Sequence, residues 1–409
     1  MKTNLADFIK DTPEGQEANA ILRACVHCGF CTATCPTYQL LGDELDGPRG
    51  RIYLMKEVLE GREVTQSTQL HLDRCLTCRS CESTCPSGVQ YGRLVDIGRA
   101  IVEERVARPL GERLKRAALR KVIPNAPLFN ALLKLGQLAK PLLPKALARK
   151  VPGSTQAGAW PALRHARRML VLQGCVQPGI APSINPALAR LLDRVGISLM
   201  AAPQAGCCGA VSYHLNAQEE GLDYMRRNID AWWPLVEQGA EAIVMTASGC
   251  GTMVKEYGHL LARDPQYAHK AKRISELTSD ATEILTSQRD ALLAKIGAGK
   301  SDRATVAFHS PCSLQHGQKI RGVAEALLAA VGYRLTVVPD GHLCCGSAGT
   351  YSILQSELSK QLLLNKVDAL QSGSPEVIAT ANIGCLAHIQ TGTAVPVRHW
   401  VELLDEALA

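Results

Sequence analysis

The chain has 409 residues, of which 46% are apolar and 20% are charged, and its formal net charge is +7. This composition excludes a disordered chain, and the length suits two or three domains with cores of their own. No run reaches the roughly 18 to 20 apolar residues that a membrane-spanning helix needs. The opening residues MKTNLADFIKDTPEGQ mix acids with lysines and lack the apolar stretch of a secretory signal. We therefore expect a cytoplasmic protein without a transmembrane segment.

Basic residues are concentrated in one part of the chain. From Arg105 to Lys150 there are twelve lysines and arginines and a single acid, Glu112, so this segment alone carries +11. The rest of the chain is acidic overall, and aromatic residues make up only 4%. A nucleic-acid partner is not expected, because it would need a broad basic surface and rings for base stacking.

Sixteen cysteines stand out, and in a reducing compartment they indicate metal ligands or redox groups rather than disulfides. Eight of them form two copies of the spacing C-x2-C-x2-C-x3-C-P, in CVHCGFCTATCP and CLTCRSCESTCP. This spacing is typical of bacterial 4Fe–4S clusters, in which the fourth cysteine of each run ligates the other cluster. Zinc knuckles, the alternative, use two C-x2-C pairs. The predicted ligands are Cys25, Cys28, Cys31 and Cys85 for cluster 1, and Cys75, Cys78, Cys81 and Cys35 for cluster 2.

The segments around these runs predict helices. Apolar residues at 52, 54, 55, 58 and 59 indicate an amphipathic helix that ends at Gly61, and a second helix is predicted from Tyr91 to Ala107. Between the runs, residues 47–51 (GPRGR) form a basic turn, either solvated or bonded to cluster sulfurs or a partner. We expect residues 1–110 to form a helical ferredoxin-like domain and residues 111–165 a basic helical linker.

The second half contains an internal duplication. A shift of 137 residues aligns Cys175 with Cys312 and the CCG triplet at Cys207 with that at Cys344, and Cys250 meets Cys385 after a two-residue slip. Each copy alternates short β-branched runs with predicted helices, at 186–195 and 217–237 in the first copy and 323–331 and 354–370 in the second. This alternation predicts α/β modules over 166–300 and 301–409, with the cysteines at the carboxyl ends of parallel strands, where open α/β sheets bind ligands.

The predicted fold class is therefore α+β multi-domain: an α-helical ferredoxin-like domain followed by two duplicated α/β cysteine-rich (CCG) modules. Each module offers four sulfurs, and three interpretations remain open: a metal or cluster site, a redox-active dithiol, or small buried cysteines that pack as hydrophobes. The candidate additional sites, for a further cluster or zinc, are Cys175, Cys207, Cys208 and Cys250, and Cys312, Cys344, Cys345 and Cys385.

This order of motifs resembles a family of iron–sulfur electron-transfer subunits that serve glycolate oxidase, anaerobic glycerol-3-phosphate dehydrogenase and heterodisulfide reductase. Residues 21–54, 71–89, 205–219, 228–234, 246–251 and 341–351 are most similar to the bacterial glycolate oxidase branch. That branch implies two 4Fe–4S clusters and flavin-containing partner subunits that oxidise glycolate to glyoxylate. It also implies that this chain passes the electrons toward a quinone or another acceptor. In the family the CCG modules often end in C-x-x-C, but here Met253 and His388 stand at the last position.

No catalytic residue is predicted in this chain. There is no G-x-G-x-x-G after a strand, no P-loop and no nucleophile elbow, so substrate oxidation is expected in partner subunits. The alternatives are a subunit of a glycerol-3-phosphate or D-lactate dehydrogenase, or a heterodisulfide-reductase-like catalytic subunit. The leucine- and lysine-rich segment 124–151 predicts either a linker packed on the flavin subunits or a peripheral contact with the inner face of the cell membrane.

Overall fold

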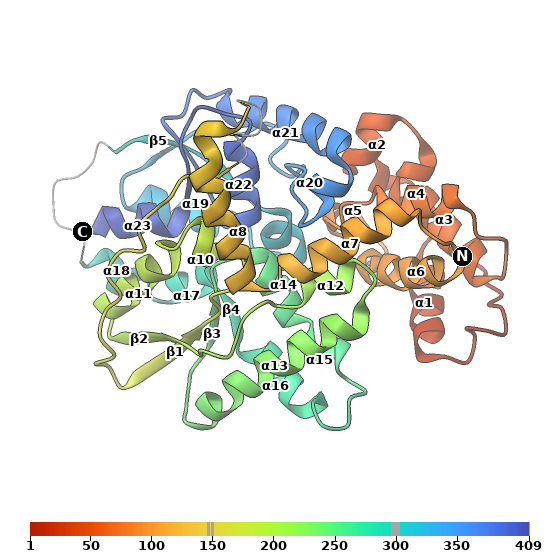
Figure 1. Ribbon diagram of the computed structural model, residues 1–409, viewed down its shortest axis with the longest axis horizontal. Coiled ribbons are helices and arrows are strands. Elements are labelled where there is room, and N and C mark those ends of the chain that lie inside the picture. The colour runs from red at the N-terminus through yellow and green to blue at the C-terminus, as the bar shows by residue number, and fades with distance from the viewer. Residues whose placement is uncertain (145–147, 149–150, 296–302, 409) are drawn as a thin grey trace. The chain divides into compact units, whose positions relative to one another are not determined.

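The computed structural model describes residues 1–144, 148, 151–295 and 303–408 (Figure 1). The chain divides into two compact units, Met1–Ala117 with His342–Lys366, and Ala118–Gly341 with Val367–Ala409. The limits expected from the sequence, at residues 110, 165 and 300, divide the chain more finely and stay predictions. Among the described residues, no helix is long and apolar enough to cross a membrane.

The first unit is built from short helices. Its elements are α1 (Pro13–Ala24), η1 (Phe30–Thr32), α2 (Pro36–Leu41), η2 (Glu44–Asp46), α3 (Pro48–Leu59), α4 (Gln66–Asp73), α5 (Ser80–Thr84), α6 (Tyr91–Arg105) and α20 (Tyr351–Leu354). The first part of α21 (Ser356–Gln371) also belongs to it, while α7 (Leu110–Val122) continues into the second unit. Both predicted front helices are confirmed, as α3 and α6.

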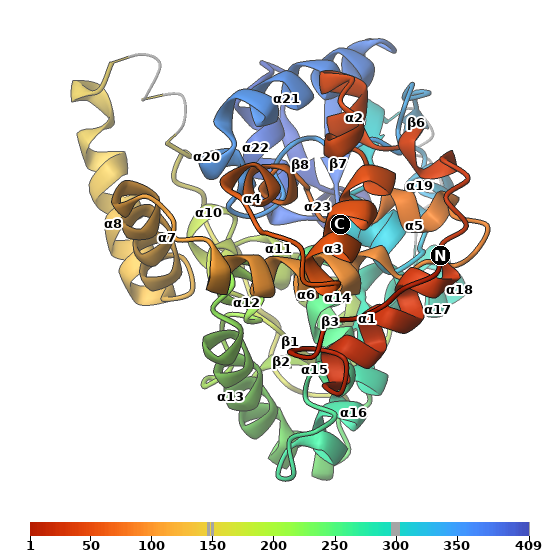
Figure 2. The same cartoon turned by 90° about the vertical axis from the view of Figure 1, so that its right-hand side faces the viewer.

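Helices α1, α3 and α6 pack together around the core of this unit (Figure 2). Helix α1 begins at Pro13, and the side chain of Thr12 accepts a hydrogen bond from the Gly15 N–H, which satisfies one of the free donors of the first turn. Where α6 crosses α3, a Cβ at Gly98 would lie 2.7 Å from the Met55 side chain, so glycine allows the close approach without displacing Met55. The packed helices hold the two cysteine runs on a fixed scaffold.

The second unit contains the two modules. Its helical elements are α8 (Ala126–Ala139), η3 (Lys140–Leu142), α10 (Gln177–Ile180), α11 (Ile184–Arg194), α12 (Ala210–His214), α13 (Gln218–Glu237), α14 (Ser248–Lys255), α15 (Tyr257–Leu260), α16 (Ala268–Leu277), α17 (Ala281–Ser287), α18 (Arg289–Leu293), η4 (Ser313–Gly317), α19 (Val323–Ala330), α22 (Ile383–Gln390) and α23 (Trp400–Leu408). The four helices predicted in the modules are confirmed to within two residues as α11, α13, α19 and α21. The rest of the expected linker helix, at 145–147 and 149–150, lies outside the described residues.

Each module has one four-stranded parallel sheet. The strands are β1 (Arg167–Val171), β2 (Ile197–Ala201), β3 (Ile243–Met245), β4 (Thr278–Asp280), β5 (Thr305–His309), β6 (Arg334–Leu335), β7 (Val377–Thr380) and β8 (Val397–His399). Their orders are β2-β1-β3-β4 and β6-β5-β7-β8, with every pair parallel. The predicted fold class is confirmed. Strands β4 and β8 were not predicted, because three polar-rich residues give no periodic signal.

The first sheet is buried on both faces. Along β1, Met169 and Val171 face a core that includes residues of α11 and α17, whereas Leu170 and Leu172 face a second core with α13 and α14. In Figure 1, α13, α15 and α16 lie together on the second side. Burial on both faces explains the nearly continuous apolar run of β1, since alternate side chains point to opposite faces.

The two modules pack on each other with reciprocal contacts. Helix α11 of the first module contacts α23 of the second, and α17 of the first contacts α19 of the second. In the same way, α14 contacts η4 and α10 contacts α22. Since α11 corresponds to α19, α17 to α23, α10 to η4 and α14 to α22 in the duplication, each contact has its counterpart, as in a twofold dimer. One hydrophobic core continues through both modules.

Candidate metal centres

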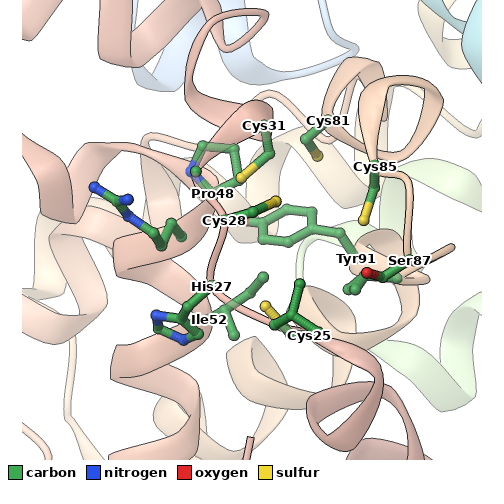
Figure 3. A pocket seen from close by; sticks show the side chains of 14 residues that line it. Cys25, His27, Cys28, Cys31, Pro48, Ile52, Cys81, Cys85, Ser87 and Tyr91 are labelled. Atoms are coloured by element: carbon green, nitrogen blue, oxygen red, sulfur yellow. The ribbon is translucent and has the colours of Figure 1, made fainter.

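The first cysteine run lines a pocket of about 430 Å³ in the helical unit. Its wall includes Cys25, Cys28 and Cys31, and Cys85 from the second run. Cys25 ends α1, Cys31 lies in η1 and Cys85 ends α5, so three different elements carry the thiols. Figure 3 shows these side chains around one space, with the ring of Tyr91 among them. The structure thus brings together the four residues predicted for cluster 1.

A second pocket of about 300 Å³ lies next to the first. Its wall includes Cys75, Cys78 and Cys81, and Cys35 from the first run. Cys81 lines both pockets, and the hydroxyl of Thr84 donates to that of Thr34 over 3.2 Å, joining the two runs one residue before their fourth cysteines. The residues predicted for cluster 2 are therefore also together, with the fourth cysteines exchanged between the runs.

The two loops have the same backbone form. His27 and Gly29 have φ of 57° and 84°, and the corresponding Thr77 and Arg79 have φ of 54° and 59°. Left-handed residues at alternate positions curl the chain so that successive N–H groups point inward, a form that suits anions. A cluster ligated by four thiolates is such an anion.

The thiols themselves indicate that the group in each pocket contains metal cations, even if its overall charge is negative. Burial, together with the neighbouring Cys25 thiol, raises the pKa of Cys31 to about 11, and burial also raises the pKa of Cys81 well above its usual value. Thiols forced together in this way ionise only if a positive charge joins them. Iron supplies that charge. The donors are all sulfur, with four cysteines in the second pocket and, counting the shared Cys81, five in the first, and this donor set fits 4Fe–4S clusters.

The four cysteines of the first module also meet. Cys207 contacts the thiols of both Cys175 and Cys208, and Cys208 contacts Cys250, so the four sulfurs form a continuous row. Hydrogen bonds from its two neighbours lower the pKa of Cys207, while the bond to Cys207 raises the pKa of Cys175. Cys175 comes after the end of β1, Cys207 and Cys208 come after the end of β2, and Cys250 lies at the start of α14, after β3. The four cysteines thus lie at the carboxyl ends of the parallel strands, as predicted.

The CCG turn of this module is fixed by its surroundings. Gly209 has φ of +89°, and a Cβ there would lie 2.6 Å from the Gly221 carbonyl oxygen, so the turn requires glycine. The carbonyl of Cys207 accepts from the Asn228 amide over 2.8 Å, and that of Cys208 accepts from the Tyr257 hydroxyl over 2.8 Å. These buried bonds hold the adjacent thiols in place.

The cysteines of the second module are divided between the two units. Cys344 and Cys345 lie in the first unit, and Cys312 and Cys385 in the second. The Gly346 N–H donates to the Cys344 sulfur over 3.4 Å, and the Asn382 amide donates to that of Cys385 over 3.4 Å. A site for these four cysteines together stays a prediction.

Two positions replace the family's last cysteine. Met253 is 3% exposed and packs in the core beside Val254 and Tyr257, so it fills space there. His388 lies in the last turn of α22 and is only partly buried. No metal site is assigned to either residue.

Sequence reasoning left the burial of one cation open and missed a second one. The basic turn at 47–51, expected to be either solvated or bonded to cluster sulfurs or a partner, forms the start of α3, and Arg51 there is 1% exposed. Arg99 on α6 is 8% exposed and was not singled out at all. The proline at the first helical position, Pro48, was a signal that a helix begins at this point.

Comparison with known proteins gives matches over the whole chain. Residues 21–89 match the 4Fe–4S dicluster domain family, and residues 169–255 and 306–390 match the cysteine-rich domain family. The glycolate oxidase iron–sulfur subunit of Escherichia coli (strain K12) is 57% identical over 409 residues, covering 100% of this chain and 99% of that protein. The probable glycolate oxidase iron–sulfur subunit of Bacillus subtilis (strain 168) is 30% identical over 96% of this chain and 92% of that protein. Lactate utilization protein A of the same strain is 28% identical over 56% of this chain.

Proposed function

The chain belongs to the family of glycolate oxidase iron–sulfur subunits, and from this premise we propose that it carries electrons from glycolate oxidation in flavin-containing partner subunits toward a quinone. The oxidation product would be glyoxylate. The observation that carries this proposal is the division of eight thiols into two adjacent pockets that share Cys81. Bound there, two 4Fe–4S clusters would accept and release electrons singly.

The chain's own part is to hold and insulate these groups. The packed helices α1, α3 and α6 fix the thiols, and in the second loop the Thr77 N–H donates to the Cys75 sulfur over 3.4 Å. Three of the four thiols of the second pocket, those of Cys35, Cys75 and Cys81, are buried. The exposed thiol of the first pocket, Cys28, suits an approach by an electron donor or acceptor.

The partner requirement gives a direct test. The isolated chain, prepared anaerobically with its clusters, is expected to stay oxidised when glycolate is added, because its sequence has no flavin or nicotinamide motif. Once the flavin subunits are added, glycolate should bleach the visible absorbance of the clusters. Glycolate oxidation by the isolated chain would contradict the proposal. Reduction of the complex by lactate or glycerol 3-phosphate, but not by glycolate, would assign the chain to another branch of the family.

The four sulfurs of the first module support a proposed further site for a cluster or zinc, formed by Cys175, Cys207, Cys208 and Cys250. Four thiols in contact match the donor set of either group. Metal analysis of the full chain distinguishes a cluster, a zinc ion and an empty site. If the site is filled, the chain should contain zinc, or iron beyond that of the two front clusters, and this extra metal should be lost in the Cys208→Ser variant.

We also propose that α8 contacts the inner face of the membrane. Its leucines at 132, 135, 138 and, just beyond, 142 are exposed, and the side facing α10 carries the contacts to the rest of the unit. No acidic residue occurs between Arg113 and Arg164. An exposed apolar row flanked by lysines is suited to an anionic lipid surface.

Charge reversal of Lys134 and Lys140 to glutamate is therefore expected to weaken binding of the complex to anionic vesicles. Loss of the two positive charges alone costs about 2 kcal/mol, at about 1 kcal/mol per basic residue, and the added glutamates are repelled by the lipid, so binding should weaken by at least roughly thirtyfold. The control reverses two exposed lysines elsewhere in the unit, Lys272 and Lys295, and should leave cosedimentation with vesicles unchanged. Equal binding by both variants would favour a linker packed on the flavin subunits. The third lysine of the predicted patch, Lys145, lies outside the described residues.

A further inference from the structure

Two buried arginines reach the region behind the second pocket from neighbouring helices, in addition to the half-buried Arg79 in the pocket wall. Arg51 on α3 lines the pocket and is 1% exposed, and Arg99 on α6 is 8% exposed. A guanidinium is charged at every physiological pH, and burying it without an anion is costly. The charge balance around these two side chains therefore indicates what the pocket holds.

Arg99 gives its donors to oxygens without formal charge. Its guanidinium donates to the Leu72 carbonyl at 2.7 Å, the Cys75 carbonyl at 2.7 Å and the Thr77 hydroxyl at 3.0 Å. Two of these partners are close to a thiol of the second pocket, since the Thr77 N–H donates to the Cys75 sulfur over 3.4 Å. These hydrogen bonds fix the direction of the cation and leave its charge unneutralised.

Arg51 shares a single carboxylate with other cations. Asp46, which is fully buried, lies 3.3 Å from Arg51 and 2.8 Å from Arg74, and His71 is 3.1 Å away. One negative charge thus faces two guanidinium groups. Two further N–H groups of Arg51 donate to the His71 carbonyl at 2.7 Å and to the Thr37 hydroxyl at 3.1 Å.

Two hydroxyl groups then reach the sulfurs of the same pocket. The Thr37 hydroxyl lies 3.3 Å from the Cys35 sulfur, and the Tyr91 hydroxyl donates to the Cys75 sulfur over 3.7 Å. The Thr37 hydroxyl accepts from Arg51 and donates to the Asp46 carbonyl over 2.8 Å, so it links the guanidinium to the neighbourhood of the Cys35 sulfur without donating to that sulfur.

The first pocket has a different charge environment. Its arginine, Arg49, is bound by both oxygens of Glu44, at 2.6 and 3.1 Å, so the pair is neutral. The Arg49 side chain is also 37% exposed, and water screens such a charge far better than the interior does. The ammonium of Met1 also lies near the first run, where it donates to the Cys25 carbonyl at 2.8 Å, but it is only partly buried. The fully buried positive charge therefore lies on the side of the second pocket.

We propose that Arg51 and Arg99 raise the reduction potential of the cluster held by Cys35, Cys75, Cys78 and Cys81 above that of its neighbour, so that an electron entering the domain rests there. The inference depends on the proposed cluster assignment. Reduction adds one negative charge, which nearby cations and hydrogen bonds to sulfur stabilise. Burial of the thiols by itself lowers the reduction potential, because the added negative charge is poorly solvated. The same burial also removes the water that would screen the positive charge of the arginines.

The test is a redox titration of the full chain followed by electron paramagnetic resonance. The Cys78→Ser variant identifies the signal of the second cluster. In the unaltered protein this signal should appear first as the potential is lowered with dithionite. If it appears last, the proposal is overturned, whatever the variants do. If fewer than two clusters are present, the cluster assignment itself fails, which metal analysis reveals separately.

The charge variants test the cause. Arg99→Gln is expected to lower the potential of the second cluster by at least 59 mV, a tenfold change in its reduction equilibrium, and to leave the first unchanged. Arg99→Lys keeps the charge and should recover most of the shift. The control is Arg93→Gln on the same helix, whose partly exposed side chain pairs with Glu17. Two results for Arg99→Gln would disprove the proposed effect of the arginine. One is an unchanged reduction potential of the second cluster while both signals are present, and the other is an equal shift in the potentials of both clusters.

Discussion

Replacing Cys85 by serine is expected to remove or disable the cluster of the first run, although Cys85 belongs to the second run. Its thiol lines the pocket of Cys25, Cys28 and Cys31. A cubane that loses one of four thiolates is poorly held, so the iron of the front domain should fall from about eight to about four atoms per chain. Anaerobic metal analysis with acid-labile sulfide measures this loss.

The matched control is the counterpart cysteine of the first run. Cys35→Ser should disturb the cluster of Cys75, Cys78 and Cys81 and spare the other, because its thiol lines the second pocket. Spectra of the two variants should therefore be complementary. If Cys85→Ser disturbs only the cluster of its own run, the exchange of fourth cysteines is incorrect.

Asp46→Ala is expected to destabilise the front unit severely. The carboxylate is fully buried and is shared by Arg51, Arg74 and His71. Removing one partner of a buried ion pair leaves an unpaired charge and costs about 3–5 kcal/mol. The loss should appear as a lower urea midpoint for bleaching of the clusters, since the same network lies behind the second pocket.

A surface pair provides the comparison. Asp7 is 94% exposed where it meets Lys10, so water already solvates both charges and the pair contributes little. Asp7→Ala should leave the urea midpoint nearly unchanged. Equal effects of the two substitutions would mean that the buried network does not support the cluster pockets.

Local spacing determined what the sequence could predict. Two-residue gaps between cysteines place three thiols in one loop, and both runs have this form, with left-handed residues at equivalent positions. The duplication was visible because four cysteines and the strand–helix alternation recur in the same order in both copies. Six of the strands, β1, β2, β3, β5, β6 and β7, were recognisable as short apolar or β-branched runs between helices.

Only the tertiary structure decided the charge environment of the pockets. Arg49 and Arg51 are two residues apart in one basic turn, yet Arg49 is a partly exposed, neutralised cation and Arg51 is buried behind the second pocket. Arg99 comes beside Cys75 from a helix 24 residues further along the chain. Sequence fixes which residues carry charge, but the reduction potential depends on distance and burial, and these arise only when α3, α4 and α6 pack.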